Sequence, residues 1–218
     1  INSKINNKPT SVLQRLDLEH HLHPFTDHKE LKSQKPRIIT RADGVFIYDN
    51  DGNRFLDAMS GLWCVNIGYG RKELALAAKK QMEELPYYNT FFQSSHPPAI
   101  ELSAKIASLA PKDLSSIFFS SSGSEANETN IRLVRHYWAS LGKPAKKIII
   151  SRKNAYHGSS MGAGSLGGMS TMHSQGGLPI PYIEHINQPY WYGEGGNEYP
   201  DDFGKRRALE LEKKINNL

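Results

Sequence analysis

The chain has 218 residues, of which 38% are hydrophobic and 22% charged, and this composition is that of a globular protein rather than a disordered one. Its formal net charge is +5, but the lysines and arginines are interspersed with acidic residues, so the sequence does not favour a nucleic-acid partner. No apolar run approaches the ~18 residues of a membrane span, and the single cysteine, Cys64, excludes an intrachain disulfide, so we expect a cytoplasmic protein without a membrane partner.

The first 60 residues combine a polar segment with short β-type runs. Residues 1–35 are polar and contain four histidines within HHLHPFTDH at 20–28. Histidine is a common metal ligand, but no cysteine is nearby and a proline directly follows the His-x-His sequence, so we predict a surface or interface segment and no metal site. Residues 37–61 predict a small antiparallel meander. Its turn signals are Asp43-Gly44 and Asp51-Gly52, and its apolar strand positions are Ile39, Val45, Ile47 and Phe55.

From Tyr69 onward, helical and strand-like patterns alternate, which predicts βαβ units and a parallel sheet. The predicted helices are 71–85, 98–110, 124–142 and 201–218, and the predicted strands are 115–120 and 146–151. The expected buried positions are Leu102, Ile106 and Leu109 in the second helix, Ile131, Val134, Trp138 and Leu141 in the third, and Ala208, Leu211 and Ile215 in the last. Residues 154–200 show little periodicity, which in a compact domain indicates a functional segment.

The strongest local signal is FFSSSGSEANET at 118–129, where a strand runs into Ser-Ser-Gly-Ser and a helix begins at once. Ser122 and Glu125 have the spacing of a capping box, and Gly123 would let the backbone turn tightly and approach a ligand. The free N–H groups of a first helical turn favour a phosphate dianion, to which the hydroxyls of Ser122 and Ser124 can add hydrogen bonds. An ordinary capped helix explains the same residues equally well.

A second signal follows the predicted strand 146–151. Tyr156, His157 and Gly158 are expected at its carboxyl end, where open α/β sheets bind ligands. Tyr156 offers a face on which a flat heteroaromatic ring can stack, and a buried tyrosine with a satisfied hydroxyl is the alternative.

The same segment contains a glycine pattern that resembles a dinucleotide motif. Gly162, Gly164 and Gly167 spell G-x-G-x-x-G. In a dinucleotide fold this motif must leave a strand directly and open a helix. Here the predicted strand ends near Ser151, so we do not expect a dinucleotide site.

Four stretches together resemble the class III aminotransferases, the pyridoxal-phosphate-dependent enzymes of fold type I. They are DGNRFLDAMSGLWCVNIGYGR at 51–71, PYYNTFFQSSHP at 86–97, SSGSEANETNIRLVRHYW at 121–138 and AYHGSSMGAGSLGG at 155–168. The opening HHLHPFTDH is similar to the pyruvate-dependent ω-amine transaminase branch. The resemblance implies an incomplete α/β fold. Residues 1–60 would belong to the small domain, and residues 61–218 would be the first half of the large domain, which binds the cofactor on a parallel sheet.

The resemblance also implies a role for each candidate residue. The phosphate of pyridoxal phosphate is expected at Ser122, Gly123 and Ser124. Its ring is expected against Tyr156, beside His157 and Gly158. The substrate pocket is expected at Phe25, Trp63, Phe91 and Phe92, for which core packing is the alternative.

Two further expectations come from the same family. The loop with Phe91 and Phe92 reaches toward the active site of the partner subunit in family dimers, so a homodimer is expected. Three aromatic residues are candidates for the lip of the pocket, with core packing as the alternative, and these are Tyr190, Trp191 and Tyr192.

Three residues that the family needs have no counterpart here. They are the lysine that forms the Schiff base with the cofactor, the aspartate paired with the ring nitrogen, and a late arginine that binds the acceptor carboxylate. Lys146, Lys147 and Lys153 match no Schiff-base context of the family. We therefore expect no catalytic residue in this chain, and a fragment, truncated gene or piece of a split protein that is inactive alone.

The implied reaction of the whole protein is transfer of an amino group from an amine or ω-amino acid to a keto acid such as pyruvate. Two alternatives stay open at this point. One is another reaction of the same fold, catalysed by a mutase or decarboxylase. The other is a non-catalytic fragment that binds the cofactor or forms a dimer.

Overall fold

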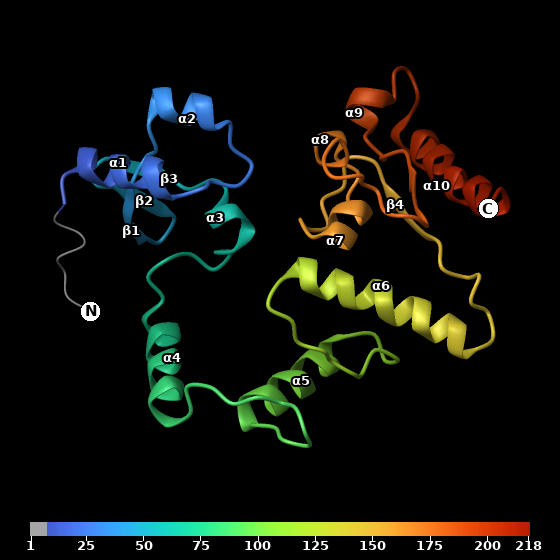
Figure 1. The fold of residues 1–218 in the computed structure, drawn as a ribbon, viewed down its shortest axis with the longest axis horizontal. Helices are drawn as coiled ribbons and strands as arrows, with labels where there is room; N and C mark the ends of the chain where they lie inside the picture. The colour runs from blue at the N-terminus through green and yellow to red at the C-terminus, as the bar shows by residue number, and fades with distance from the viewer. Residues whose placement is uncertain (1–7) are drawn as a thin grey trace. The chain divides into compact units, whose positions relative to one another are not determined.

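The computed structural model describes residues 8–218, and the chain divides between Pro97 and Pro98 into two compact units (Figure 1). The implied boundary between residues 60 and 61 concerns the domains of the whole protein and stays a prediction. None of the helices in the described part of the chain is both long and apolar enough to cross a membrane.

A three-stranded antiparallel sheet lies in the first unit and confirms the predicted meander. Its strands pair in the order β1 (Ile39–Asp43), β2 (Phe46–Asp49) and β3 (Arg54–Leu56). The two Asp-Gly turns place Gly44 at a φ of 56° and Gly52 at a φ of 86°. These angles lie in the left-handed region, which favours glycine, so both turn signals are explained by backbone geometry.

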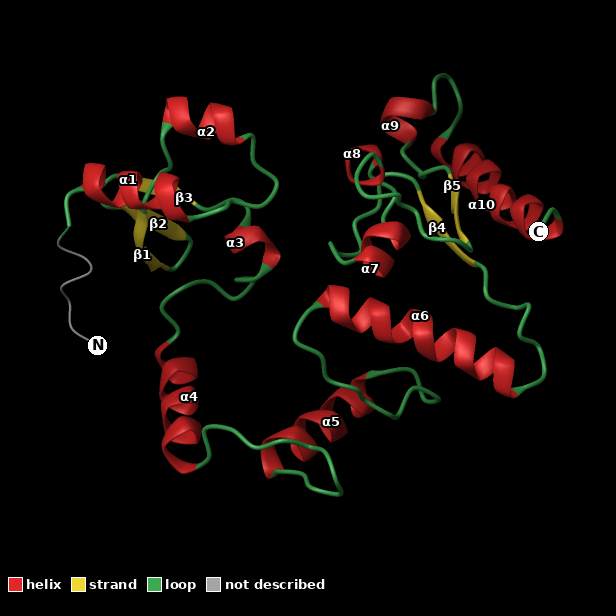
Figure 2. Cartoon of the chain, in the orientation of Figure 1, coloured by secondary structure: helices red, strands yellow, loops and turns green. Residues whose placement is uncertain are grey.

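Four helices lie in the described part of the first unit, residues 8–97, and Figure 2 shows them with the meander. They are α1 (Thr10–His20), α2 (His28–Gln34), α3 (Ser60–Trp63) and α4 (Lys72–Glu84). Helix α4 confirms the predicted helix at 71–85, whereas α1 and α2 lie where only a polar segment was expected. Helix α2 begins after Asp27, whose carboxylate accepts hydrogen bonds from the N–H groups of Lys29 at 2.8 Å and Glu30 at 3.3 Å. A capping aspartate therefore marks a helix whose apolar pattern is weak.

The second unit contains a parallel pair of strands with helices around it. Its elements are α5 (Pro97–Leu109), α6 (Gly123–Ser140), β4 (Ile149–Arg152), α7 (Met161–Leu166), α8 (Ser170–His173), β5 (Ile183–Ile186), α9 (Trp191–Glu194) and α10 (Pro200–Asn216). Strand β4 pairs in parallel with β5, with Ile149 opposite Ile183. This pairing confirms the βαβ pattern, although β5 lies in the segment where no strand was expected.

The predicted strand at 115–120 is wrong. These residues have no strand assignment, and Phe118 and Phe119 are 68% and 45% exposed. A strand exists only through hydrogen bonds to a neighbour. No backbone hydrogen bond to 115–120 forms within residues 8–218. The apolar run therefore remains extended chain on the surface of the second unit.

A small apolar core holds the second unit together. Ile131 of α6, Leu166 of α7 and Ile183 of β5 are buried against one another, with Ile149 and Ile180 packed around them. The Ser165 hydroxyl lies beside this core, where it donates to the carbonyl of Met161 at 2.6 Å and accepts from the N–H of Ile180 at 2.9 Å. The core therefore positions α6 and α7 on the parallel strand pair.

Three predicted apolar faces are largely exposed, and in α6 only Ile131 of the four expected positions is buried. In α5, Leu102 and Leu109 are 50% and 75% exposed. In α10, Leu211 and Ile215 are exposed, whereas Phe203 on another face is buried. Helix α10 lies beside β5 (Figure 2), and Phe203 and the ionic side chains of α10 make the inward contacts.

Candidate functional site

The first turn of α6 forms one side of the candidate site. The Ser122 hydroxyl accepts a hydrogen bond from the N–H of Glu125 at 3.1 Å. The Glu125 carboxylate accepts a hydrogen bond from the N–H of Ser121 at 2.8 Å. The predicted capping box is therefore present, with its second bond made to Ser121 instead of Ser122. Within residues 8–218, the N–H groups of Gly123 and Ser124 have no protein acceptor. The helix therefore presents two free donors at its positive end, an arrangement that favours an anion.

Gly123 does not have the backbone geometry expected from the sequence. Its φ lies outside the left-handed region, and a Cβ added there would meet no atom within 4 Å. The expectation of a tight turn that only glycine can make is therefore wrong. The space beside Gly123 is open, so neither backbone strain nor protein packing requires a glycine at this position.

A loop after β4 packs onto the first two turns of α6. The Ser124 hydroxyl accepts the N–H of Ser159 at 3.0 Å. The Asn127 side chain donates to the carbonyl of His157 at 2.8 Å. These two bonds join residues 35 and 30 positions apart in the chain. They bring the predicted cofactor segment at 156–158 beside the free N–H groups of α6.

Gly158 makes the closest approach between the loop and the helix. It is buried and has a φ of 130°. A Cβ added there would lie 2.7 Å from the Cβ of Ala163 and 2.9 Å from the Cα of Ser124, and it would collide with the Ser124 hydroxyl. Only glycine satisfies both the angle and the space. The sequence pointed to this residue, but it did not reveal that its role is to let two backbones touch.

Tyr156 and His157 lie on the open side of this junction. Tyr156 is 57% exposed, and His157 is also exposed. The alternative of a buried tyrosine is therefore wrong for the described chain. An accessible aromatic ring beside an anion-binding helix end can stack on a flat ring whose phosphate lies at that end.

Glu128 ties α6 to the beginning of α7. Its carboxylate accepts the N–H of Gly162 at 2.6 Å and that of Ala163 at 3.3 Å. The Ser160 hydroxyl and these two N–H groups hold the pKa of Glu128 below its usual range. Glu128 and Asn127 were both missed in the sequence. Their spacing from Ser124 places them on the same helix face, which is the signal that would have found them.

Glu128 also explains one glycine of the pattern at 162–167, because a Cβ added to Gly162 would collide with its carboxylate. Gly162 and Gly164 lie inside α7 rather than in a turn before it, and both are buried. The first N–H groups of α7 are occupied by the protein's own carboxylate. The geometry therefore agrees with the expectation that this pattern is not a dinucleotide motif.

We expect Glu128→Gln to change the response of the fold to acid. Because the pKa of Glu128 is below its ordinary value of 4.5 in the folded state, the ionised carboxylate stabilises the fold above that value, and this stabilisation is lost as the pH falls below it. Melting temperatures between pH 7 and pH 3.5 should therefore fall less steeply below about pH 5 in the variant. Glu83→Gln, at an exposed position of α4, is the control. Equal slopes for Glu128→Gln and the unmodified protein would contradict the contact.

The four predicted pocket residues lie in the first unit and are all exposed. Phe25 is 71% exposed, Trp63 75%, Phe91 69% and Phe92 95%. None of them packs into a core of the described chain. Three of them also have positive φ angles, which are 49° for Phe25, 64° for Trp63 and 54° for Phe92. Bulky residues rarely adopt this conformation, and such strain is often found at functional sites.

The strain is concentrated in the turn that carries Trp63. Four consecutive residues, Ser60–Trp63, have positive φ, and Gly61 and Leu62 have ψ angles of 38° and 53°. Element α3 is therefore a left-handed turn, closed by a hydrogen bond from the N–H of Trp63 to the carbonyl of Met59 at 2.9 Å. A left-handed conformation costs roughly 1–2 kcal/mol for each residue that is not glycine. Contacts around the turn must offset that cost.

Two polar side chains provide such contacts. The Asp57 carboxylate accepts the N–H of Gly61 and the hydroxyl of Tyr69, each at 2.7 Å. The Tyr69 hydroxyl and the N–H of Gly61 hold the pKa of Asp57 below its usual range, and the same hydrogen bond raises the pKa of Tyr69. Neither residue was singled out in the sequence, because nothing in the local pattern indicates a left-handed turn.

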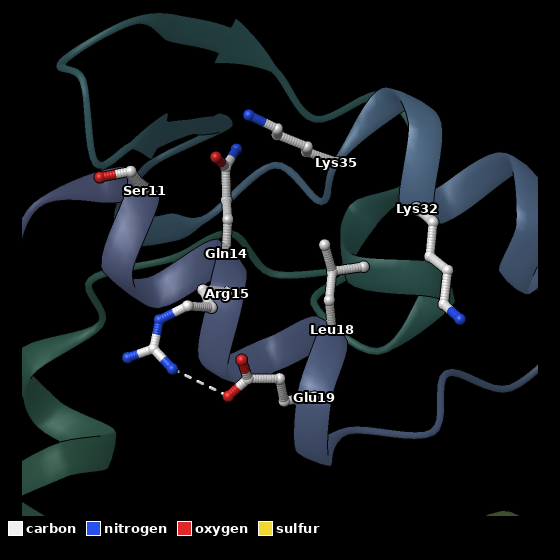
Figure 3. A pocket seen from close by; sticks show the side chains of 7 residues that line it. All are labelled: Ser11, Gln14, Arg15, Leu18, Glu19, Lys32 and Lys35. Carbon is white, nitrogen blue, oxygen red and sulfur yellow. Dashed lines mark hydrogen bonds and ion pairs between the residues drawn. The ribbon is translucent and has the colours of Figure 1, made fainter.

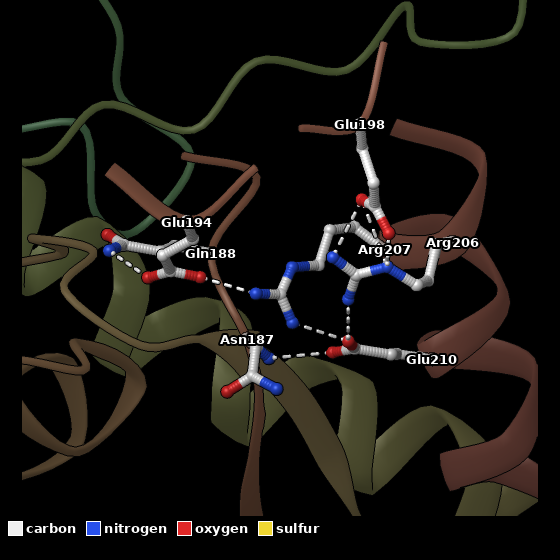
Figure 4. Close-up of polar contacts among 7 residues, drawn as sticks. All are labelled: Asn187, Gln188, Glu194, Glu198, Arg206, Arg207 and Glu210. Carbon is white, nitrogen blue, oxygen red and sulfur yellow. Dashed lines mark hydrogen bonds and ion pairs between the residues drawn. The ribbon is translucent and has the colours of Figure 1, made fainter. Parts of the chain in front are cut away.

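An ionic network joins α9 to α10 (Figure 4). Arg207 of α10 is 11% exposed at its side chain and pairs with Glu194 and, at 2.5 Å, with Glu210. Glu210 also accepts the N–H of Asn187, which follows β5, at 3.3 Å. The network therefore anchors α9 and α10 to the end of the strand pair. The predicted lip residues Tyr190, Trp191 and Tyr192 are 48%, 42% and 87% exposed.

The histidine-rich segment forms a small polar cluster. Asp17 accepts one hydrogen bond from His21 Nδ1 at 3.0 Å and another from His23 Nε2 at 2.7 Å. The three ligand-type atoms lie within 4.8 Å of one another. The carboxylate of Asp17 thus has a hydrogen bond to each imidazole ring. These bonds tie the end of α1 to the residues that follow it. The absence of a metal from this segment stays a prediction.

Two hollows lie near α1 and α2, away from the candidate cofactor residues in sequence. One has a volume of about 440 Å³, and the Arg15–Glu19 ion pair of α1 is part of its lining (Figure 3). Its lining residues are Ser11, Gln14, Arg15, Leu18, Glu19, Lys32 and Lys35. The other, of about 320 Å³, includes Phe25 among its lining residues.

Comparison with known proteins agrees with these features. The model of the family described as class-III aminotransferase matches residues 28–217. A putrescine–pyruvate aminotransferase of Pseudomonas aeruginosa is 58% identical over 99% of this chain, which covers 47% of that protein. The chain therefore spans about half the length of this curated relative.

Solved structures give the same result. An (S)-enantioselective omega-transaminase from Thermomicrobium roseum superposes with a TM-score of 0.92 at 41% identity, over 96% of this chain and 47% of that one. An omega transaminase from Pseudomonas jessenii in complex with PMP gives 0.90 at 39%, over 94% and 46%. A thermostable omega transaminase variant engineered for synthesis of bulky amines gives 0.90 at 38%, over 94% and 46%; its replacements include one tryptophan and one phenylalanine.

Proposed function

Because this chain belongs to the class-III aminotransferase family, whose members use pyridoxal phosphate, we propose that the whole protein transfers an amino group from an amine to pyruvate. The relative with 58% identity over nearly the whole chain acts on putrescine and pyruvate by its name. It supports an aliphatic diamine as the donor. The observation in the structure that supports the proposal is the close approach of Gly158 to Ser124, at a helix end whose first two N–H groups have no protein acceptor within residues 8–218.

The residues at this junction fit pyridoxal phosphate. The N–H groups of Gly123 and Ser124 would donate to its phosphate, and the open space beside Gly123 leaves room for it. The hydroxyls of Ser122 and Ser124 already accept hydrogen bonds through their oxygens, so their protons remain available to phosphate oxygens. The helix end would complement the remaining charge.

The ring of the cofactor would lie against Tyr156, with His157 and Gly158 beside it. When bound, pyridoxal phosphate supplies an electron sink that stabilises negative charge next to the transferred nitrogen. Asn127 and Glu128 would act indirectly, by holding the loop and α7 against α6. We place the lysine that holds the cofactor and moves the proton outside these 218 residues, since no lysine here matches its context in the family.

The substrate pocket would be lined by Phe25, Trp63, Phe91 and Phe92. The engineered transaminase described above supports two of these assignments. Its tryptophan and phenylalanine replacements are separated along that chain by the same number of residues as Trp63 and Phe91. The exposed Phe91-Phe92 loop would complete the pocket of a partner subunit in a homodimer. A cytoplasmic location stays a prediction from the single cysteine.

The test is a balance of substrates and products with the whole protein. Putrescine and pyruvate should yield alanine and the aminoaldehyde in equal amounts, and the rate should depend on added pyridoxal phosphate. Release of carbon dioxide without alanine would show a decarboxylase. Rearranged amine without loss of pyruvate would show a mutase. Either result, or no reaction with any amine, would overturn the proposed function.

A further inference from the structure

We propose that Asp57 and Tyr69 are positioning residues that hold Trp63 in place and thereby limit the size of the amines that the protein accepts. The inference rests on the proposed function, in which Trp63 lines the substrate pocket. It adds two residues that lie outside that pocket and act on it through the left-handed turn at Ser60–Trp63.

The turn needs a contact that holds it. The positive-φ conformation is sterically unfavourable for Ser60, Leu62 and Trp63, because each has a Cβ. Without an external contact, such a turn relaxes toward right-handed or extended angles. Relaxation would change the direction in which the Trp63 side chain leaves the backbone. Within residues 8–218 the Trp63 ring is 75% exposed and packs into no core, so here the backbone turn determines its direction.

One carboxylate oxygen provides that contact. Oδ2 of Asp57 accepts both the N–H of Gly61, in the middle of the turn, and the hydroxyl of Tyr69. The Tyr69 hydroxyl lies directly against the turn, because a Cβ added to Gly61 would be 2.9 Å from its oxygen. Hydrogen bonds to a charged acceptor are among the stronger ones in proteins. Asp57 and Tyr69 therefore restrain the turn from its inner side.

The β-meander in turn holds both residues. The N–H of Asp57 donates to the carbonyl of Val45 at 2.9 Å, just after β3. Tyr69 pairs with Gly44 through two backbone hydrogen bonds of 2.8 and 3.3 Å. Both anchors lie at the turn between β1 and β2. The turn that carries Trp63 is therefore attached to a hydrogen-bonded sheet rather than to a free loop.

The protonation states support this arrangement. The hydrogen bond with Tyr69 comes first among the contacts that lower the pKa of Asp57, and it raises the pKa of Tyr69. At neutral pH the carboxylate is thus the acceptor and the phenol the donor. The hydrogen bond from Tyr69 to Asp57 is therefore formed at neutral pH.

The experiment replaces Tyr69 by phenylalanine in the whole protein, which removes one hydroxyl and little volume. Tyr48→Phe is the matched control, because Tyr48 lies on β2 under Arg41 and its hydroxyl makes no hydrogen bond within residues 8–218. The first readout is the ¹⁹F resonance of Trp63 in protein labelled with 5-fluorotryptophan. The second is the ratio of kcat/KM for putrescine to that for a bulky arylalkyl amine.

We expect Tyr69→Phe, but not Tyr48→Phe, to shift or broaden the Trp63 resonance and to move the ratio about tenfold toward the bulky amine. In a protein that already carries Trp63→Ala, Tyr69→Phe should change the ratio no further, because the restraint acts only through Trp63. Asp57→Asn gives the same test if Tyr69→Phe does not fold.

An unchanged Trp63 resonance and ratio in Tyr69→Phe would overturn the inference. So would an equal change of the ratio in the Trp63→Ala background, since Tyr69 would then act by another route. If the unmodified protein transfers no amino group, the proposed function fails and the limit on amine size fails with it. The ¹⁹F resonance would still decide whether Tyr69 holds Trp63.

Discussion

Replacing Gly158 by alanine should weaken pyridoxal-phosphate binding by the whole protein about tenfold or more and destabilise the fold by about 1–3 kcal/mol. The added Cβ has no room, because it would lie 2.7 Å from the Cβ of Ala163 and 2.9 Å from the Cα of Ser124. To relieve this overlap, the loop must move away from α6 and carry Tyr156 with it. Cofactor affinity from absorbance titration and stability from urea unfolding measure the two effects.

Two glycine variants separate the causes of this loss. Gly142 has a φ of 72°, but a Cβ there meets nothing within 4 Å, so Gly142→Ala shows the effect of a positive φ without overlap. Gly123→Val also meets open space, and it should weaken cofactor binding while the fold stays stable. Equal losses in Gly158→Ala and Gly142→Ala would show that the close approach to α6 is unimportant. Unchanged affinity in Gly123→Val would show that no phosphate lies beside α6.

The 218 residues by themselves should show no amino transfer above the rate of free pyridoxal phosphate. The reaction needs a lysine near the Gly158–Ser124 junction. Two of the lysines considered in the sequence analysis contact aromatic rings at other places in the second unit. Lys146 lies 3.7 Å from the centre of the Trp138 ring, and Lys147 lies 4.0 Å from that of Tyr182. Trp138 is about 20 Å along α6 from Ser124 at 1.5 Å per residue.

Alanine formation from putrescine and pyruvate is the measurement for this chain. The whole protein at the same concentration is the positive control, and pyridoxal phosphate alone gives the background. Turnover by the 218 residues that clearly exceeds the background, and that a heat-denatured sample lacks, would refute the expected inactivity.

Local patterns were sufficient to predict most of the regular structure. Helices α4, α5, α6 and α10 and the β-meander all lie where apolar spacing and turn residues placed them. The cap of α6 could be predicted because Ser122 and Glu125 are three positions apart. Each of these features depends on residues within a few positions of one another.

The errors come from features that depend on distant parts of the chain. Residues 115–120 have the composition of a strand but form no backbone hydrogen bond within residues 8–218. The short β5 exists because it pairs with β4, more than 30 residues earlier. In α10, Phe203 and the ionic contacts of Arg207 determine which face is turned inward. Its apolar stripe with Leu211 and Ile215 therefore stays exposed.

The sequence predicted the two segments of the candidate site but not the contacts that join them, because those contacts also depend on distant residues. Motifs identified the segments at 122–124 and 156–158, and the structure brings the two together. It does so through Asn127 and Glu128, whose partners lie at least 30 residues away. The left-handed turn at Trp63 has only one glycine among its four residues, so its conformation leaves no trace in the local sequence.

The most direct measurement is the location of the lysine that holds the cofactor. Borohydride reduction of the whole protein with bound pyridoxal phosphate fixes the cofactor covalently on that lysine, and peptide mass spectrometry then identifies it. We expect a single labelled lysine outside these 218 residues, and loss of the label in Gly158→Ala at limiting cofactor. A label on Lys146, Lys147 or Lys153, or no label on any lysine, would contradict it.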